Sequence, residues 1–204
     1  MSLKPSKIVC VGKNYLDHAK EMGSDLPPDP LLFFKPPSAL IAAGQPIVLP
    51  RSSSHVEHEA EIAVVIGSRL RHADEAAAMR GVAGFVCLND VTARDWQKRE
   101  SQWGRAKGFD TFCPLGDQAV PVADWRGLEV IGRVNGVVRQ HGRAADMHFG
   151  IPFLVSHISQ FFTLEPGDVI ATGTPAGVGR LNPGDVVEVE IPGVGILRNP
   201  VVAE

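Results

Sequence analysis

The chain of 204 residues has few cysteines, no long apolar run and no run of basic residues. Its three cysteines, Cys10, Cys87 and Cys113, show no paired spacing, which argues against a disulfide framework and favours reduced structural thiols. No stretch of about 18 uncharged apolar residues could span a bilayer, and the N-terminus lacks an apolar signal region. We therefore expect a cytoplasmic protein without a membrane partner.

The charge balance excludes further classes of partner. With 20 basic and 23 acidic residues the net charge is -3, so no electrostatic footprint for nucleic acid or an anionic membrane is present. A hydrophobic share of 44% and a charged share of 21% are typical of a globular protein. We expect one domain over residues 1–204 that acts on a small molecule.

Glycine and proline, at 21 and 16 residues, interrupt the sequence often and favour many short strands over long helices. The expected class is α+β and β-rich. Residues 135–136, Asn-Gly, are the strongest hairpin signal, between strands at 128–134 and 137–140. The other expected strands are 8–12, 31–35, 47–49, 57–66, 82–88, 168–172, 185–191 and 196–202, and the expected helices are 14–22, 74–80 and 152–162, the last with Leu154, Ile158 and Phe161 on its apolar face.

Two glutamates open the most apolar strand of the chain. On a strand, Glu59 and Glu61 project from one face with Cα atoms about 6.6 Å apart, and His58 points to the other face. Like charges on an apolar strand need compensation. Asp90 ends the next apolar run, so three carboxylates without a cysteine or histidine ligand set predict an oxygen-ligand site for Mg²⁺ or Mn²⁺.

The joint order of several motifs resembles the fumarylacetoacetate hydrolase superfamily, especially its short acylpyruvate hydrolase-like members. The resemblance covers nearly the whole chain and implies the family's mixed β-sandwich roll with short peripheral helices, together with a homodimer. The motifs that carry it are IVCVGKNY at 8–15, FFKP at 33–36, HEAEIAVVIG at 58–67, NDVTARDWQ at 89–97, AKGFD at 106–110 and TGTPAGVG at 172–179.

The resemblance also implies roles for single residues. Glu59, Glu61 and Asp90 match the family's ligands for Mg²⁺ or Mn²⁺, and Lys107 matches a lysine that contacts the substrate or its enolate. Three residues apart, His18 and Glu21 could form an ordinary surface contact on a helical turn. In the similar enzymes the matching pair lies on a lid and activates water, a task that suits histidine.

Three further positions are expected to contact the substrate. Gln97 and Lys13 match family positions of this kind, although some relatives carry arginine where Lys13 stands. The glycine-rich segment 172–179 lacks the Gly-Lys-Ser/Thr ending of a P-loop. We expect it to form a tight turn that presents backbone donors and the Thr174 hydroxyl donor to a substrate carboxylate.

The family members similar to this chain imply a metal-dependent hydrolase that cleaves the C3–C4 bond of 2,4-dioxo acids into pyruvate and a carboxylic acid. An oxaloacetate decarboxylase, a keto–enol tautomerase, or an isomerase or decarboxylase of an aromatic meta-cleavage pathway would use the same stabilised enolate, and a shared fold does not separate them. A metal-organised binding module without turnover is a further alternative, but it would not need the His18–Glu21 pair.

Overall fold

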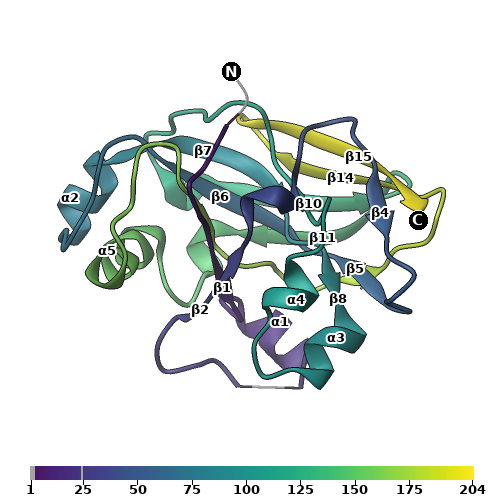
Figure 1. Cartoon of the computed structure of the whole chain (residues 1–204). Helices are drawn as coiled ribbons and strands as arrows, with labels where there is room; N and C mark the ends of the chain where they lie inside the picture. Colours follow the sequence, from purple (N-terminus) through teal and green to yellow (C-terminus); the bar gives the residue numbers. More distant parts are fainter. Residues whose placement is uncertain (1–2, 24) are drawn as a thin grey trace.

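The computed structural model describes residues 3–23 and 25–204, and its strands form two large sheets (Figure 1). The first sheet has the order β2 (Leu31–Lys35), β1 (Ile8–Gly12), β12 (Val169–Ala171), β6 (Ala60–Ile66) and β7 (Val82–Asn89). The second has the order β11 (Val137–Arg143), β10 (Glu129–Val134), β14 (Val186–Ile191), β15 (Gly195–Ala203) and β4 (Ile47–Leu49). Smaller groups are β13 (Gly179–Arg180), β5 (Val56–His58) and β8 (Thr92–Ala93), and the pair β3 (Leu40–Ile41) and β9 (Cys113–Pro114).

The alternation of side chains along β6 places the core. Ile62, Val64 and Ile66 lie in a buried cluster that also contains β14 and β15 side chains of the second sheet. Ala63 and Val65 project from the opposite face into a separate cluster with β1, β7 and β12. Because both faces are covered, the whole strand is buried, and a carboxylate that continues either face is removed from water.

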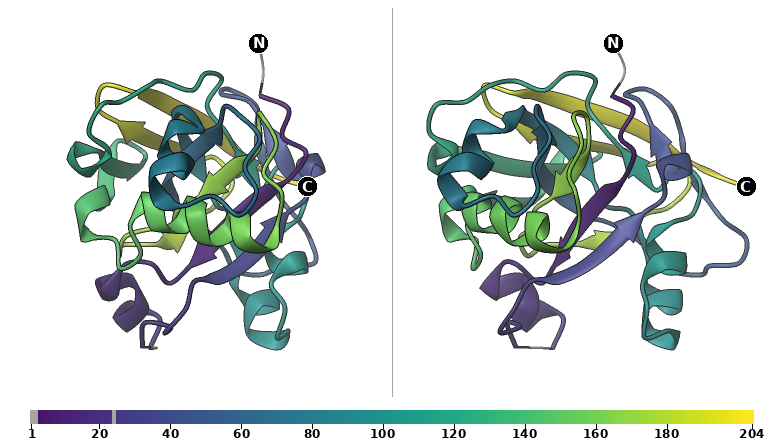
Figure 2. Two further views of the ribbon diagram at one scale, coloured as in Figure 1. Left: turned by 90° about the vertical axis from the view of Figure 1, so that its left-hand side faces the viewer. Right: turned by 60° about the vertical axis from the view of Figure 1, so that its left-hand side comes forward.

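Short helices lie around the sheets (Figure 2). Helices α2 (Glu75–Arg80) and α5 (Ile151–Phe161) pack against each other, and so do α3 (Arg94–Arg99) and α4 (Gly104–Lys107). Helix α1 (Leu16–Glu21) lies at the same end of the molecule as α3 and α4 but apart from them. Single 3-10 turns occupy Pro37–Ala39, Trp125–Gly127 and Ala144–Asp146. Within the described ranges, no helix has the length and apolarity needed to cross a bilayer.

The β-rich α+β prediction is confirmed, and two local predictions need correction. The strand expected over 57–66 is interrupted at Glu59: β5 pairs with β13 and β8, whereas β6 pairs with β12 and β7. Phe161, expected on the apolar face of α5, is 61% exposed because it is the last residue of the helix, beyond the sheet that covers Leu154 and Ile158.

The predicted hairpin is present. Asn135 and Gly136 connect β10 and β11 with φ angles of 53° and 77°. Two positive φ values at the central positions are those of a type I′ turn, which asparagine and glycine tolerate best. The closing hairpin of β14 and β15 is also confirmed, with Val189 opposite Leu197.

Asp168 fastens the N-terminal segment to the start of β12. Its carboxylate accepts hydrogen bonds from the backbone N–H groups of Ser6 (3.0 Å), Lys7 (3.1 Å) and Glu165 (2.8 Å) and from the Ser6 hydroxyl (2.7 Å), and it pairs with the Lys7 ammonium. Burial raises the pKa of Asp168, but the bonds from Lys7, Glu165 and Ser6 outweigh burial and hold the pKa below its ordinary value.

We expect Asp168→Ala to lower the free energy of unfolding by about 2–4 kcal/mol, because several donors lose their acceptor. Urea unfolding at neutral pH measures this difference. A depressed pKa stabilises the fold above the ordinary pKa of about 3.9, so the gap between wild type and variant should narrow as the pH falls below about 4. Asp17→Asn, at an exposed carboxylate, is the control, and a gap that widened in acid would contradict the assignment.

Candidate active site and metal centre

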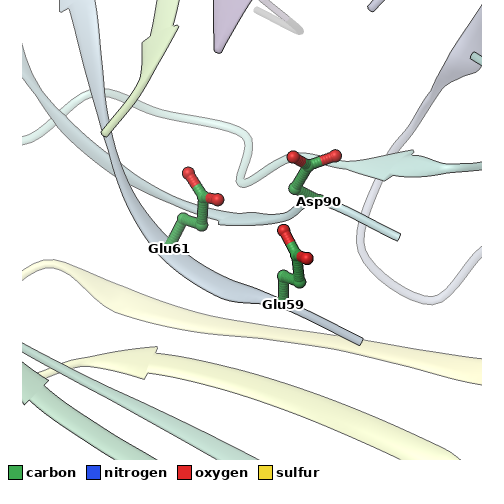
Figure 3. A group of neighbouring side chains, drawn as sticks. All are labelled: Glu59, Glu61 and Asp90. Atoms are coloured by element: carbon green, nitrogen blue, oxygen red, sulfur yellow. The ribbon is translucent and has the colours of Figure 1, made fainter. Parts of the chain in front are cut away.

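Three buried carboxylates lie close together at the start of β6 and the end of β7. Glu59 precedes β6, Glu61 is its second residue, and Asp90 follows β7; in Figure 3 the three side chains point into one space. Their exposed fractions are 4%, 2% and 0%, and one oxygen of each lies within 4.8 Å of the others. The pairing of Ala60 with Asn89 brings the two strand ends together, so the register of β6 on β7 builds the group.

Two of these carboxylates are held by buried cations. The Lys107 ammonium donates to Glu59 Oε2 and Asp90 Oδ2, both at 2.7 Å. Lys35 donates to Asp90 Oδ1 at 2.6 Å, and an Arg94 Nη2 lies 2.6 Å from Glu59 Oε1. Both oxygens of Glu59 and both oxygens of Asp90 therefore face a cation, which fixes the rotation of each carboxylate.

Glu61 differs from its two neighbours. It accepts a hydrogen bond from the Gly173 N–H at 2.9 Å, but among residues 3–23 and 25–204 it forms no ion pair. Burial, together with the charges of Asp90 and Glu59, raises the pKa of Glu61 well above its usual range. A buried carboxylate with this deficit of positive charge fits a divalent cation that would be shared with Glu59 and Asp90.

The neighbouring charges of the site shift the pKa values of Glu59 and Lys107 in opposite directions. Burial raises the pKa of Glu59, but the charges of Lys107, Arg94 and His18 outweigh burial and hold that pKa far below its ordinary value. Burial lowers the pKa of Lys107, and the charges of Asp90 and Glu59 more than reverse this and raise it. Glu59 is thus ready to act as an anionic ligand, and Lys107 remains a cation at neutral pH.

A cavity of about 210 Å³ opens onto the carboxylates. It is lined by eight of the nine residues singled out in the sequence: Lys13, His18, Glu59, Glu61, Asp90, Gln97, Lys107 and Thr174. The ninth, Glu21, lies behind His18. The structure therefore brings the predicted metal, catalytic and substrate residues to one place, although their roles remain predictions.

His18 and Glu21 form the expected pair. His18 is 5% exposed, and its Nδ1 lies 3.1 Å from Glu21 Oε2, one turn along α1. Glu21 is itself fixed by the Gly177 N–H, which lies 3.1 Å from Oε1. If Nδ1 carries the proton shared with Glu21, Nε2 is left with a lone pair that can accept a proton from a ligand in the cavity.

One wall of the cavity is formed by two aromatic rings, and Gly12 leaves the space for one of them. The ring of Trp103 meets that of Phe33 edge-on at 5.3 Å between centroids, and the Lys107 ammonium lies 5.1 Å from the Phe33 ring centre. A Cβ at Gly12 would stand 2.7 Å from the Trp103 ring, so only glycine lets the indole close this wall. Trp103 also accepts the Lys107 backbone N–H at 3.0 Å, which fixes α4 and with it the lysine.

Three donors of the glycine-rich segment 172–179 are bonded within the protein itself. Its backbone donors at Gly173 and Gly177 point to Glu61 and Glu21, side chains of the protein itself. The Thr174 hydroxyl donates to the Ala60 carbonyl at 2.9 Å. Presentation of any of these three donors to a substrate carboxylate would require its present bond to break. Contact between this segment and a substrate stays a prediction.

Arg94 and Lys35 were missed in the sequence. Arg94 donates through Nε to Glu57 Oε2 at 2.6 Å and through Nη1 to the side-chain oxygen Oε1 of Gln97 at 2.9 Å, besides its contact with Glu59. For Glu57, the partner of Arg94, the sequence offered a signal, because Glu57 continues the alternate spacing of Glu59 and Glu61. For Lys35, a lysine at the end of the apolar strand FFK was the only hint.

The cysteines are free and buried, as the sequence indicated. Burial raises the pKa of Cys87 and of Cys113 to about 12, and it also raises the pKa of Cys10 well above its ordinary value. Thiols in this state are poor nucleophiles, so none of the three competes with the carboxylate site as a centre of chemistry.

Comparison with known proteins decides the family. Residues 7–202 match the fumarylacetoacetate (FAA) hydrolase C-terminal family. The chain belongs to this family of enzymes. The predicted resemblance is thereby confirmed, and the FAA hydrolase family accounts for the sheet-rich fold with few short helices.

Several FAA hydrolase relatives carry names of enzymes that act on oxo acids or their enols. The mitochondrial oxaloacetate tautomerase of Homo sapiens is 46% identical over 98% of this chain and 67% of its own length. The crystal structure of a 2-hydroxyhepta-2,4-diene-1,7-dioate isomerase from Mycobacterium marinum has a TM-score of 0.91 at 45% identity, covering 99% of this chain and 76% of that one. A 5-carboxymethyl-2-hydroxymuconate delta-isomerase from Mycobacterium smegmatis gives 0.92 at 46%, covering 99% and 80%.

Proposed function

We propose that this protein forms and stabilises the enolate of a small 2-oxo acid with the help of a divalent metal, Mg²⁺ or Mn²⁺. The observation that carries the proposal is the meeting of Glu59, Glu61 and Asp90 with Lys107 and His18 around one cavity of about 210 Å³. A divalent ion held by the three carboxylates would act as a Lewis acid toward the carboxylate and keto oxygens of an oxo acid.

The protein's own residues supply the rest of the chemistry. His18, oriented by Glu21, takes a proton from C3 of the oxo acid or from a water molecule. Lys107 is a buried, permanently charged donor close to the carboxylates, so it stabilises negative charge as it develops on the ligand. The side-chain oxygen Oε1 of Gln97 accepts a hydrogen bond from Arg94, so Gln97 offers its amide N–H groups to the cavity.

Keto–enol exchange of oxaloacetate is the first candidate reaction. Removal of a C3 proton by His18 and its return to the enolate oxygen would complete the exchange without loss of carbon. The relatives named as a tautomerase and as isomerases support this outcome. Decarboxylation of oxaloacetate would instead break the C3–C4 bond, release carbon dioxide and leave a pyruvate enolate that the same groups would stabilise.

Hydrolysis of acylpyruvates at the C3–C4 bond is the second candidate. The observation that favours it is the His18–Glu21 pair at 3.1 Å, which can activate water for attack on the C4 carbonyl. Bond cleavage then expels a pyruvate enolate beside Lys107. The products are pyruvate and a carboxylic acid.

Three substrates distinguish these outcomes in one ultraviolet assay. Oxaloacetate, acetylpyruvate and fumarylpyruvate are followed with Mg²⁺ and with a chelator, while a pyruvate-detecting enzyme reports cleavage. Faster keto–enol relaxation of oxaloacetate without pyruvate indicates the tautomerase, and pyruvate from either acylpyruvate indicates the hydrolase. Glu59→Gln should remove the metal-dependent rate and Asp17→Asn should retain it. No metal-dependent acceleration on any of the three would refute the proposal and favour a binding module.

A further inference from the structure

The orientation of one buried amide is fixed by a backbone group. Gln140 lies on β11 and is 1% exposed. Its Oε1 lies 2.9 Å from the Ala60 backbone nitrogen, which can only donate, so the amide cannot be flipped. Oε1 also lies 2.9 Å from His58 Nδ1, and because an amide oxygen can only accept, Nδ1 carries the proton of this bond.

The amide nitrogen of Gln140 then determines what Thr174 can do. Nε2 donates to Thr174 Oγ1 and to the Pro175 carbonyl oxygen, both at 2.7 Å. The Thr174 hydroxyl already accepts from Gln140, and it donates its own proton to the Ala60 carbonyl oxygen at 2.9 Å. A hydroxyl has one proton and two lone pairs, so Thr174 retains one lone pair for a ligand and no proton.

The residues that line the cavity therefore differ in the hydrogen bonds that they can form. Gln97 and Lys107 line it as donors, because Arg94 occupies the Gln97 oxygen and an ammonium has no lone pair. Thr174 also lines it, and because its proton is donated to Ala60, its hydroxyl can take part in a further hydrogen bond only as an acceptor. Carboxylate and keto oxygens carry only lone pairs and would be repelled by the Thr174 oxygen, whereas a hydroxyl or an N–H group would be attracted.

We propose that Thr174 accepts a hydrogen bond from the ligand and so selects the enol over the keto form of the oxo acid at its end of the cavity. The assignment rests on the proposed function, because a tautomerising oxo acid is the ligand that presents this choice. Gln140 and His58 act as positioning residues, since they hold the Thr174 hydroxyl in its accepting orientation.

Oxalate and oxamate form a pair of probes, because oxamate has an amide NH₂ in place of one carboxylate oxygen of oxalate and carries one negative charge fewer. The charge difference is the same for every variant, so it cancels when variants are compared. Calorimetric titration of the Mg²⁺-loaded protein gives a dissociation constant for each. Thr174→Val removes the accepting oxygen at nearly constant volume. The dissociation constant of oxamate should rise by roughly five- to tenfold, the contribution of one neutral hydrogen bond, and that of oxalate should stay within about twofold of the wild-type value. Thr174→Ser keeps the hydroxyl and should restore the wild-type ratio.

The comparison is a ratio of two ligands on the same variant, so a partly destabilised variant still gives a valid result. If Thr174→Val lowered the affinity for both probes equally, or lowered the affinity for oxalate more, the inference would be overturned, while the oxo-acid site would stay in place. Failure of the Mg²⁺-loaded wild type to bind either probe would overturn the proposed function and this assignment together.

Discussion

Glu61→Gln is expected to abolish divalent metal binding and, at the same time, to stabilise the metal-free protein. Glu61 is the carboxylate of the group without a cationic partner in the described residues, and its burial makes the charged form costly. Glutamine keeps an oxygen for the Gly173 N–H and removes the charge. We expect metal affinity to fall by at least about a hundredfold and metal-free stability to rise by about 1–2 kcal/mol.

Thermal unfolding with and without Mn²⁺ measures both effects. Wild type should gain melting temperature with metal, because ligand binding to the folded state stabilises it. The variant should begin at a higher melting temperature and gain nothing. Glu188→Gln, a substitution outside the cavity, is the matched control. A metal-induced gain in the Glu61 variant equal to that of wild type would show that the ion binds elsewhere.

His18→Gln is expected to lower turnover by about 10²–10⁴-fold, which is the usual contribution of a general base. Glutamine occupies similar space but has no basic nitrogen. Metal affinity should stay within about twofold, because His18 is not one of the three carboxylate ligands. Rates on oxaloacetate and on an acylpyruvate, together with a Mn²⁺ titration, separate the two quantities.

The same substitution also separates the two candidate reactions. If His18 activates water only, acylpyruvate cleavage falls and oxaloacetate exchange is spared; if it moves the C3 proton, both fall together. Glu21→Gln should give a smaller loss, because the imidazole remains but is less well oriented. His157→Gln on α5 is the control, and unchanged rates on every substrate for His18→Gln would exclude the residue from catalysis.

Features that depend on local sequence were predictable. The Asn135-Gly136 turn, the strands β1, β2, β6 and β7, and the carboxylates follow from turn chemistry and from alternation along short segments. Because successive side chains on a strand alternate, Glu59 and Glu61 were bound to share a face. That Asp90 joins them required only that β7 lie beside β6.

Features that depend on contacts between distant segments could not be predicted from the sequence. The role of Arg94 follows from the pairing of β8 with β5, which places Ala93 opposite Val56, 37 residues earlier in the chain. No local pattern encodes this pairing. The break at Glu59 arises because β5 and β6 join different sheets. Helix α4 has four residues and no side-chain cap, so propensity could not reveal it.

The peptide groups of Gly173 and Gly177 hold Glu61, the proposed metal ligand, and Glu21, the proposed partner of the general base. This has a consequence for how a site of this kind can diversify. A main-chain donor survives the replacement of neighbouring side chains. Over evolutionary time the residues between these two glycines can therefore change, and with them the oxo acid that is preferred, while the reacting groups stay where they are. New specificities can arise on this loop without the catalytic apparatus being rebuilt.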